Sequence, residues 1–209
     1  MAARVVSSES LVGEGAVLVA ALGDSITAGS PHWDPNPLVR KQIGPELDRA
    51  SQWEYWAAQK HPDLAFRNCG VYGERTDEIA KRLEDCAAGA EVLVVQGGIN
   101  NVAQGRPPEG AAADLRGMVR RGKELGLRVA LTDVLPWNGG YPRAVEPIDE
   151  LNRRIAAIAR EEGVPLLPFH DTLVDPDRPG HMRGEWTSDG DHPSVEGYRR
   201  LGELAFRLP

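Results

Sequence analysis

The sequence has no apolar run close to the roughly 18 consecutive residues that a membrane-spanning helix requires. It is also poor in cationic side chains: 24 Lys and Arg stand against 31 Asp and Glu, which gives a formal net charge of −7. The cationic residues form no dense cluster. The sequence therefore argues against nucleic-acid binding and predicts no stable membrane anchor.

Cysteine is scarce as well. Cys69 and Cys86 are the two cysteines of the chain, and they fit neither a C-x-x-C motif nor the spacing of metal ligands. In the predicted structure Cys69 ends a strand, whereas Cys86 lies near the far end of the next helix. About ten helical residues at 1.5 Å each would separate them by roughly 15 Å, which is too far for a disulfide. The sequence thus predicts two buried free thiols and no metal site.

The composition is ordinary for a soluble globular protein, with 41% apolar and 26% charged residues. A length of 209 residues suits one α/β domain, and no linker, repeat or low-complexity tract divides the chain, so we predict one domain over residues 1–209. Residues 1–15 contain Glu9 and Glu14 as well as Arg4, and they lack the apolar core of a signal peptide. We expect a cytoplasmic protein, or a secreted one whose signal peptide is absent from this sequence.

Short apolar segments alternate with segments of helical periodicity along the chain. The apolar segments have the length and the branched residues of strands that are buried on both faces. Between them lie apolar stripes at helical spacing, such as Ile148, Leu151 and Ile155. This alternation predicts right-handed crossovers and a parallel sheet that helices cover on both faces. The predicted strands are Val17–Leu22, Leu64–Asn68, Glu91–Gln96, Leu127–Val134 and Val164–Phe169.

Polar residues follow the first predicted strand, at the edge where an α/β sheet binds its ligands. Gly23 lets the chain turn, and Ser25 comes two residues later. A serine becomes a nucleophile when a histidine takes its proton and a carboxylate orients that histidine. His192 has Asp189 three residues before it, a spacing that can fold the carboxylate onto one imidazole nitrogen. From spacing alone, a polar turn that caps the helix beginning near Ser194 explains this segment equally well.

Two further segments could donate hydrogen bonds to a developing oxyanion. One follows the second predicted strand and ends at Gly73, and the other follows the third and adds the side-chain amide of Asn100. Taken singly, these glycines are typical turn residues and the asparagine is a typical cap.

Taken together, four segments occur in a fixed order: Gly23-Asp24-Ser25, Gly73, Gly98-Ile99-Asn100 and Asp189-Gly190-Asp191-His192. They resemble the defining blocks of the SGNH (GDSL) hydrolase superfamily, and the resemblance covers residues 16–206. It implies a three-layer α/β/α flavodoxin-like sandwich with a five-stranded parallel sheet in the order 2-1-3-4-5.

The resemblance also implies an activity. It makes this chain a serine esterase that acts on a small-molecule ester and needs no cofactor. Ser25 would be the nucleophile, His192 the general base and acid, and Asp189 the carboxylate that orients the histidine. The backbone N–H groups of Ser25 and Gly73 and the side chain of Asn100 would form the oxyanion hole.

The chain departs from the family pattern at two positions. The third block usually ends in aspartate, and here Asn101 keeps the hydrogen bonding without the charge. Asp191 often has an apolar counterpart, and it offers a second carboxylate near the histidine, so Asp189 takes the orienting role by the resemblance only. Thr27 occupies the final position of a G-x-S-x-G motif, which argues against an α/β-hydrolase.

The substrate is less well defined. Trp33, Trp137 and Tyr141 are candidates for lining an acyl or alcohol pocket, and core packing explains Trp137 equally well. The lack of a large hydrophobic helix near the site favours short-chain acyl or acetyl esters. A carbohydrate acetyl esterase, a lysophospholipase and a thioesterase are the enzymatic alternatives. The makeup of residues 23–29 also suits a phosphate- or flavin-binding loop, the alternative that is no enzyme.

Overall fold

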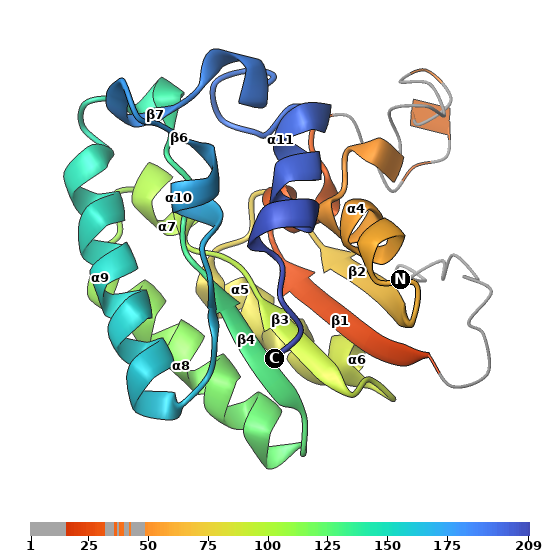
Figure 1. Cartoon of the computed structure of the whole chain (residues 1–209). Helices are drawn as coiled ribbons and strands as arrows, with labels where there is room; N and C mark the ends of the chain where they lie inside the picture. Colours follow the sequence, from red (N-terminus) through yellow and green to blue (C-terminus); the bar gives the residue numbers. More distant parts are fainter. Residues whose placement is uncertain (1–15, 32–35, 37, 40–41, 43–48) are drawn as a thin grey trace.

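A parallel sheet of five strands forms the centre of the computed structural model, which describes residues 16–31, 36, 38–39, 42 and 49–209 (Figure 1). The strand order is β2-β1-β3-β4-β5, as predicted. Leu22 near the end of β1 pairs with Cys69 of β2 on one side and with Val95 of β3 on the other. Because these three strands are parallel, the residues that follow them leave the sheet on the same side, at the carboxyl ends of the strands, which we call the carboxyl edge. The strands are β1 (Val17–Gly23), β2 (Leu64–Gly70), β3 (Val92–Val95), β4 (Arg128–Thr132) and β5 (Leu166–Leu167).

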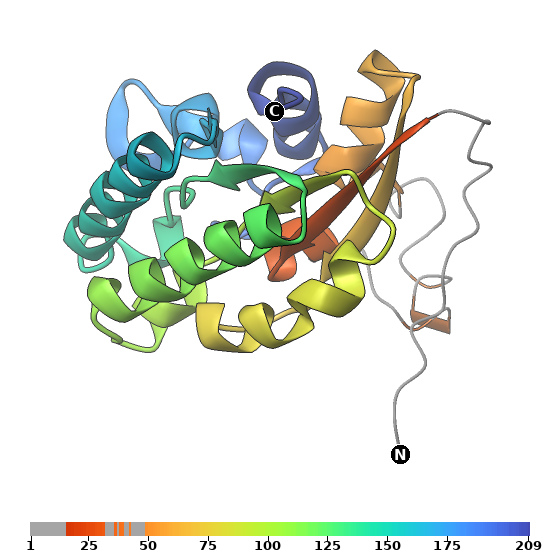
Figure 2. The ribbon, with the colours of Figure 1, turned by 90° about the horizontal axis from the view of Figure 1, so that it is seen from below.

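Helices cover both faces of the sheet, and each layer has its own apolar core (Figure 2). On one face α8 and α9 pack residues such as Leu115 and Ile155 against the strands. On the other face Trp53 of α4 packs against Phe206, the residue that follows η4 in the sequence, with ring centroids 5.6 Å apart. Because both faces are covered, the central strands are apolar throughout. The longer helices are α4 (Trp53–Lys60), α8 (Pro108–Glu124), α9 (Val145–Glu162) and α11 (Val195–Arg200), and the short ones are α1 (Ser25–Ala28), α5 (Thr76–Ile79), η1 (Ala80–Arg82), α6 (Leu83–Ala87), α7 (Ile99–Ala103), η2 (Asn138–Gly140), α10 (Phe169–Leu173), η3 (Gly184–Trp186) and η4 (Leu201–Ala205).

The fifth strand is shorter than predicted. The sequence predicts a strand over Val164–Phe169, whereas β5 spans Leu166–Leu167. Pro165 and Pro168 flank this pair, and proline has no N–H to donate to a neighbouring strand. The chain then crosses the edge of the sheet through α10 and a small antiparallel pair, β6 (Val174–Asp175) and β7 (Arg178–Met182), before it reaches α11.

The prediction of two free thiols is wrong, because Cys69 and Cys86 form a disulfide with their Cα atoms 6.0 Å apart. The prediction placed the start of the helix beside Cys69. In the structure residues 71–75 carry the chain past the end of β2 before α5 begins at Thr76. The helical segment formed by α5, η1 and α6 then runs back along the sheet and places Cys86 next to Cys69.

We expect this disulfide to stabilise the fold by about 3 kcal/mol, because closing a loop of this length removes that much conformational freedom from the unfolded chain. The bridge spans a sequence separation of 17 residues. Urea unfolding of the oxidised and the reduced protein, with thiols counted by alkylation, measures the difference. Equal unfolding free energies in the two forms would contradict it.

Candidate active site

Ser25 lies at the first position of α1, where β1 ends and the chain turns. A Cβ atom on Gly23 would collide with Thr27 Oγ1 and Gln96 Oε1, so the turn requires glycine. Asp24 caps the helix, its Oδ1 accepting the backbone N–H two residues later at 2.9 Å. Gln96 at the end of β3 accepts the Asp24 N–H at 3.0 Å and the Thr27 hydroxyl at 2.9 Å. The turn that presents Ser25 is thus locked to the neighbouring strand.

The three residues predicted to act together lie in one hydrogen-bonded chain. His192 Nε2 lies 3.1 Å from Ser25 Oγ, and His192 Nδ1 lies 2.8 Å from Asp189 Oδ2. Asp189 Oδ1 also accepts the backbone N–H groups of Asp191 and His192, at 2.8 and 2.7 Å. Partial burial alone would raise the pKa of Asp189, but the hydrogen bonds from the His192 ring and from the two backbone groups outweigh it and lower the pKa. An ionised carboxylate only accepts, so Nδ1 carries a proton, and in the neutral form of the ring Nε2 faces Ser25 with its lone pair.

The second carboxylate of this segment has a different partner. Asp191 Oδ1 accepts the indole N–H of Trp137 at 2.6 Å. Asn138, which follows Trp137, donates its backbone N–H to Gly190 O at 2.9 Å. Its side-chain amide donates to Met182 O and accepts from Met182 N–H in β7. The loop after β4 therefore clamps the segment that carries His192. The sequence analysis missed this clamp, because its partners lie 44 to 54 positions apart with no shared motif.

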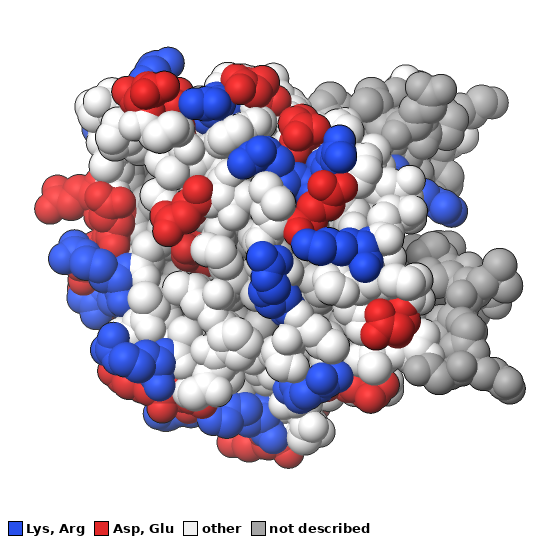
Figure 3. All heavy atoms as spheres, viewed as in Figure 1, with Lys and Arg blue, Asp and Glu red and all other residues white. Residues whose placement is uncertain are grey.

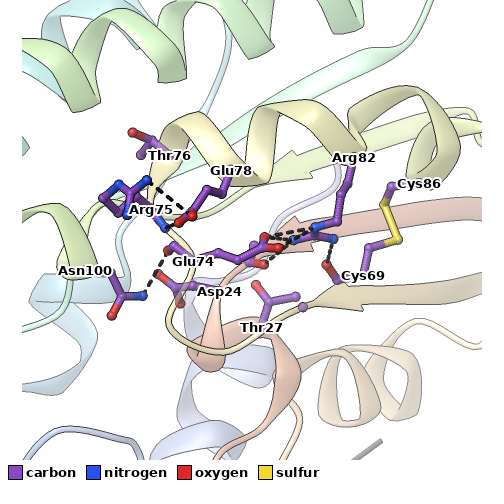
Figure 4. A network of polar contacts seen from close by, with 12 residues as sticks. Asp24, Thr27, Cys69, Glu74, Arg75, Thr76, Glu78, Arg82, Cys86 and Asn100 are labelled. Atoms are coloured by element: carbon purple, nitrogen blue, oxygen red, sulfur yellow. Dashed lines mark hydrogen bonds and ion pairs between the residues drawn. A yellow bond between two sulfur atoms is a disulfide. The ribbon is translucent and has the colours of Figure 1, made fainter. Parts of the chain in front are cut away.

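The predicted oxyanion donors come from adjacent loops. Gly73 adopts φ +71°, a conformation that favours glycine. The next residue, Glu74, accepts the Asn100 side-chain N–H through its backbone carbonyl at 3.0 Å (Figure 4). Val71 in the same loop donates its N–H to Gly23 O at 3.1 Å, two residues before Ser25. The three donor segments thus meet at the carboxyl edge of β1, β2 and β3.

Asn101, where the family that the chain resembles usually has aspartate, lies in a hydrogen-bonded network with Thr76 and Asp114. Its Oδ1 accepts the Thr76 N–H at 3.1 Å and its Nδ2 donates to Thr76 Oγ1 at 3.2 Å. The Thr76 hydroxyl in turn donates to Asp114 Oδ2 at 2.7 Å. An amide can both donate and accept, so this buried position is satisfied without an ion pair.

Two of the three predicted substrate-binding residues lie in the part of the chain that the structure describes. Trp33 lies outside the described residues. Trp137 is half-buried with its N–H on Asp191, and Tyr141 is 49% exposed with its ring centroid 4.0 Å from that of His181. Their substrate role stays a prediction.

A small pocket lies beside α1 and the segment that carries His192. Its enclosed volume is about 10 Å³, and the total reaches about 290 Å³ only when the open space at its mouth is counted. Burial raises the pKa of Asp133, one of the lining carboxyls, to about 6, although that carboxylate accepts the His170 backbone N–H. Two carboxyls and an amide therefore interrupt an otherwise apolar wall. The lining residues are Ile26, Gln96, Ile99, Asp133, Val134, Leu135, Pro136, Phe169 and Asp191.

Two further carboxyls are buried near α1. Burial raises the pKa of Asp24 to about 6 and raises the pKa of Glu54 in α4 well above its ordinary value. Glu54 Oε1 accepts from Asn68 Nδ2 at 3.0 Å, and Oε2 has no hydrogen-bond partner among the described residues. Because ionisation of Glu54 is disfavoured in the folded protein, the contribution of Glu54 to stability is full below about pH 4.5 and falls as pH rises from there, by at most about 1.4 kcal/mol per pH unit.

We expect Glu54→Gln to remove this loss, because glutamine is a neutral isostere of the protonated acid. The variant should gain unfolding free energy over the wild type as pH rises from 5 to 8, and urea titrations at both pH values measure it. Glu91→Gln, a change at an exposed glutamate, is the matched control. A difference between the Glu54 variant and the wild type that does not change with pH would refute the prediction.

Charged side chains of both signs lie intermixed on the face shown in Figure 3. The ion pairs of the described residues include Arg120 with Glu162 at 2.8 Å, between α8 and α9, and Arg199 with Glu203 at 3.0 Å. Within the described ranges, no three His, Cys, Asp or Glu side chains converge as ligands for a metal ion.

Comparison with known proteins agrees with this architecture. The chain shares its fold with a putative lipolytic protein of the G-D-S-L family from Desulfitobacterium hafniense, at TM-score 0.73 and 21% identity over 90% of this chain and 96% of that one. A G-D-S-L lipolytic protein from Veillonella parvula superposes at TM-score 0.72 with 20% identity, covering 90% of this chain and 94% of the other. The SGNH-hydrolase family esterase AlinE4 does so at TM-score 0.62 with 21% identity, covering 90% and 92%. A search of the curated proteins found no match. The sequence profile of the GDSL-like lipase/acylhydrolase family matches residues 21–200, and the chain therefore belongs to this family of hydrolases.

Proposed function

We propose that the protein hydrolyses short-chain carboxylic esters through an acyl-enzyme intermediate on Ser25. The observation that carries the proposal is the hydrogen-bonded chain from Asp189 through His192 to Ser25, with contacts of 2.8 and 3.1 Å. A serine is activated when a base lies within hydrogen-bond reach of its hydroxyl and a carboxylate orients that base.

In the first half-reaction Ser25 Oγ attacks the ester carbonyl carbon while His192 Nε2 takes the hydroxyl proton. The carbonyl oxygen becomes an oxyanion, which the backbone N–H groups of Ser25 and Gly73 and the Asn100 amide stabilise. The amide of Asn100 carries two N–H groups, of which Glu74 O accepts one. The C–O bond to the alcohol then breaks, and His192 gives its proton to the leaving oxygen.

In the second half-reaction water attacks the acyl group on Ser25. His192 Nε2 removes a proton from that water, the second tetrahedral intermediate collapses, and the proton returns to Ser25 Oγ as the acid leaves. Asp189 stays ionised throughout and stabilises the imidazolium that forms in each half-reaction.

The pocket beside Ile26 supports a short acyl group. Its enclosed volume is only about 10 Å³, close to the space that one water molecule needs, so a long acyl chain does not fit inside it. The carboxyls of Asp133 and Asp191 line it, and they would lose hydration without gaining partners if a long alkyl chain filled the space.

A fluorophosphonate probe and a panel of esters test the proposal. The probe should label Ser25 covalently, and kcat/KM should be higher for acetyl and butyryl esters than for octanoyl and longer ones. Acetylated sugars, a lysophospholipid and an acyl thioester in the same panel separate the alternatives. A protein that is not labelled, hydrolyses none of these esters and copurifies with a flavin would refute the proposal.

The disulfide supports an oxidising compartment as the place of action, since such bonds persist mainly outside the cytosol. Of the two predicted locations, we therefore propose the secreted one. No helix in the described parts of the chain is long and apolar enough to cross a membrane.

A further inference from the structure

Arg82, the last residue of η1, donates to three separate segments at the carboxyl edge of the sheet. Its Nη1 donates to Cys69 O at 2.6 Å, and its Nη2 to Gly23 O at 3.0 Å. Its Nε and Nη2 also bond the Glu74 carboxylate, at 2.9 and 2.6 Å. Figure 4 shows this guanidinium between the disulfide on one side and the loop that carries Glu74 on the other.

Two of these three segments lead directly to groups to which the proposed function gives a role, and the third braces the first. Gly23 precedes Ser25 by two residues at the end of β1. Glu74 directly follows Gly73, and its backbone carbonyl holds the Asn100 amide at 3.0 Å. Cys69 lies two residues before Val71, which donates its N–H to the same Gly23 carbonyl at 3.1 Å. A single side chain therefore connects the loops that carry Ser25 and Gly73, and the Glu74 carbonyl links these loops to the third donor, Asn100.

The chemistry of this contact requires arginine. A planar guanidinium has five N–H donors in a rigid fork, so it can bind a carboxylate with two bonds and still reach two carbonyl groups. The side chains of Arg82 and Glu74 are 26% and 20% exposed, so water competes weakly for these bonds. Lysine carries the same charge but presents it as a single point on a flexible stem.

The helical segment that carries Arg82 is itself fixed in place. Cys86 lies four residues, about one helical turn, after Arg82. It is bonded to Cys69, whose carbonyl is one of the acceptors of Arg82. The end of β2 and this helical segment are thus joined twice, once covalently and once through the guanidinium.

We propose that Arg82 is a positioning residue that sets the spacing of the oxyanion donors Ser25, Gly73 and Asn100. The inference rests on the proposed function. It predicts a specific kinetic effect: loss of Arg82 lowers kcat with little change in KM, because oxyanion donors act on the transition state and not on the bound ester.

Arg82→Met and Arg82→Lys test this role beside the control Arg67→Met. Arg67 donates in the same way to two carbonyls, Cys86 O and Ala88 O, but it touches none of the donor loops. Arg82→Met should lower kcat by about 10- to 100-fold, less than the about 10²–10³-fold that follows removal of an oxyanion donor. Arg82→Lys should recover part of the rate, and the control should keep the wild-type rate.

Hydrogen exchange of residues 71–75 gives a second readout, one that does not depend on turnover. The backbone amides of this loop should exchange faster in Arg82→Met than in the wild type and in the Arg67 control. If Arg82→Met fails to fold, Glu74→Gln replaces it, because this change weakens the ion pair and leaves both carbonyl contacts of Arg82 in place. It should show the same two effects at smaller size.

Unchanged kcat together with unchanged exchange in a folded Arg82 or Glu74 variant would overturn the inference, while labelling of Ser25 by the fluorophosphonate would leave the esterase intact. If the wild-type protein is not labelled and hydrolyses no ester, the proposed function fails, and the assignment of Arg82 to catalysis fails with it. The exchange measurement then reports only on the loop.

Discussion

Replacement of Ser25 by alanine should lower kcat for a short-chain ester by about 10⁴-fold or more, since the whole covalent route depends on one hydroxyl. The folded structure should be unchanged, because the side chain contributes one hydrogen bond, to His192 Nε2. Initial rates under saturating ester, with thermal melts of both proteins, measure the two effects. Covalent labelling by a fluorophosphonate should disappear with the activity.

The control for this variant is Ser30→Ala. Ser30 is also buried and lies just past the end of α1. It should keep wild-type turnover and labelling. If the Ser25 variant kept more than a small fraction of the wild-type rate, with its sequence verified by mass, the nucleophile would have to be another group.

The second large effect comes from comparing two carboxylates that lie two residues apart. Asp189→Asn should lower kcat by about 10³–10⁴-fold, because an amide at this position can donate to His192 Nδ1 and so favour the tautomer with its proton on Nε2, facing Ser25. Asp191→Asn should change kcat by about 5-fold or less, because its amide oxygen can still accept the Trp137 N–H and the cost is at most about 1 kcal/mol.

The comparison answers a question that the sequence left open. Both residues belong to the block that ends in His192. Their hydrogen-bond partners distinguish them: Asp189 binds the His192 ring at 2.8 Å, whereas Asp191 binds the Trp137 indole at 2.6 Å. Equal losses in the two variants, or a larger loss in Asp191→Asn, would show that the orienting role is shared or exchanged.

The sheet could be predicted because its signal is local. A strand buried on both faces must be apolar along its length, so β1 and β3 stand out in the sequence as short continuous runs. The strand order then followed from the family resemblance, and the structure confirms it. The same order places the ends of β1 and β3 side by side, which is why Ser25 and Asn100 could be expected at one edge.

The contacts that the sequence did not predict, or predicted wrongly, depend on how the loops between helices and strands run. Whether Cys86 can reach Cys69 depends on where residues 71–75 turn, and neither cysteine's neighbours in sequence contain that information. The partner of Asp191 is 54 positions away in a loop with no motif of its own. Gln96 and Arg82 form hydrogen bonds with backbone groups of distant segments. Because any residue type can supply a backbone group, the sequence does not mark these partners.

Ser25 and His192 are 167 positions apart in the chain. During synthesis the serine emerges early, whereas His192 emerges 167 residues later, just before α11. In the proposed mechanism the serine has no base until the His192 segment has docked beside it, so a nascent or incompletely folded chain does not attack esters. Turnover therefore counts the molecules that have finished folding, and the ratio of activity to total protein reports the folded fraction of a sample.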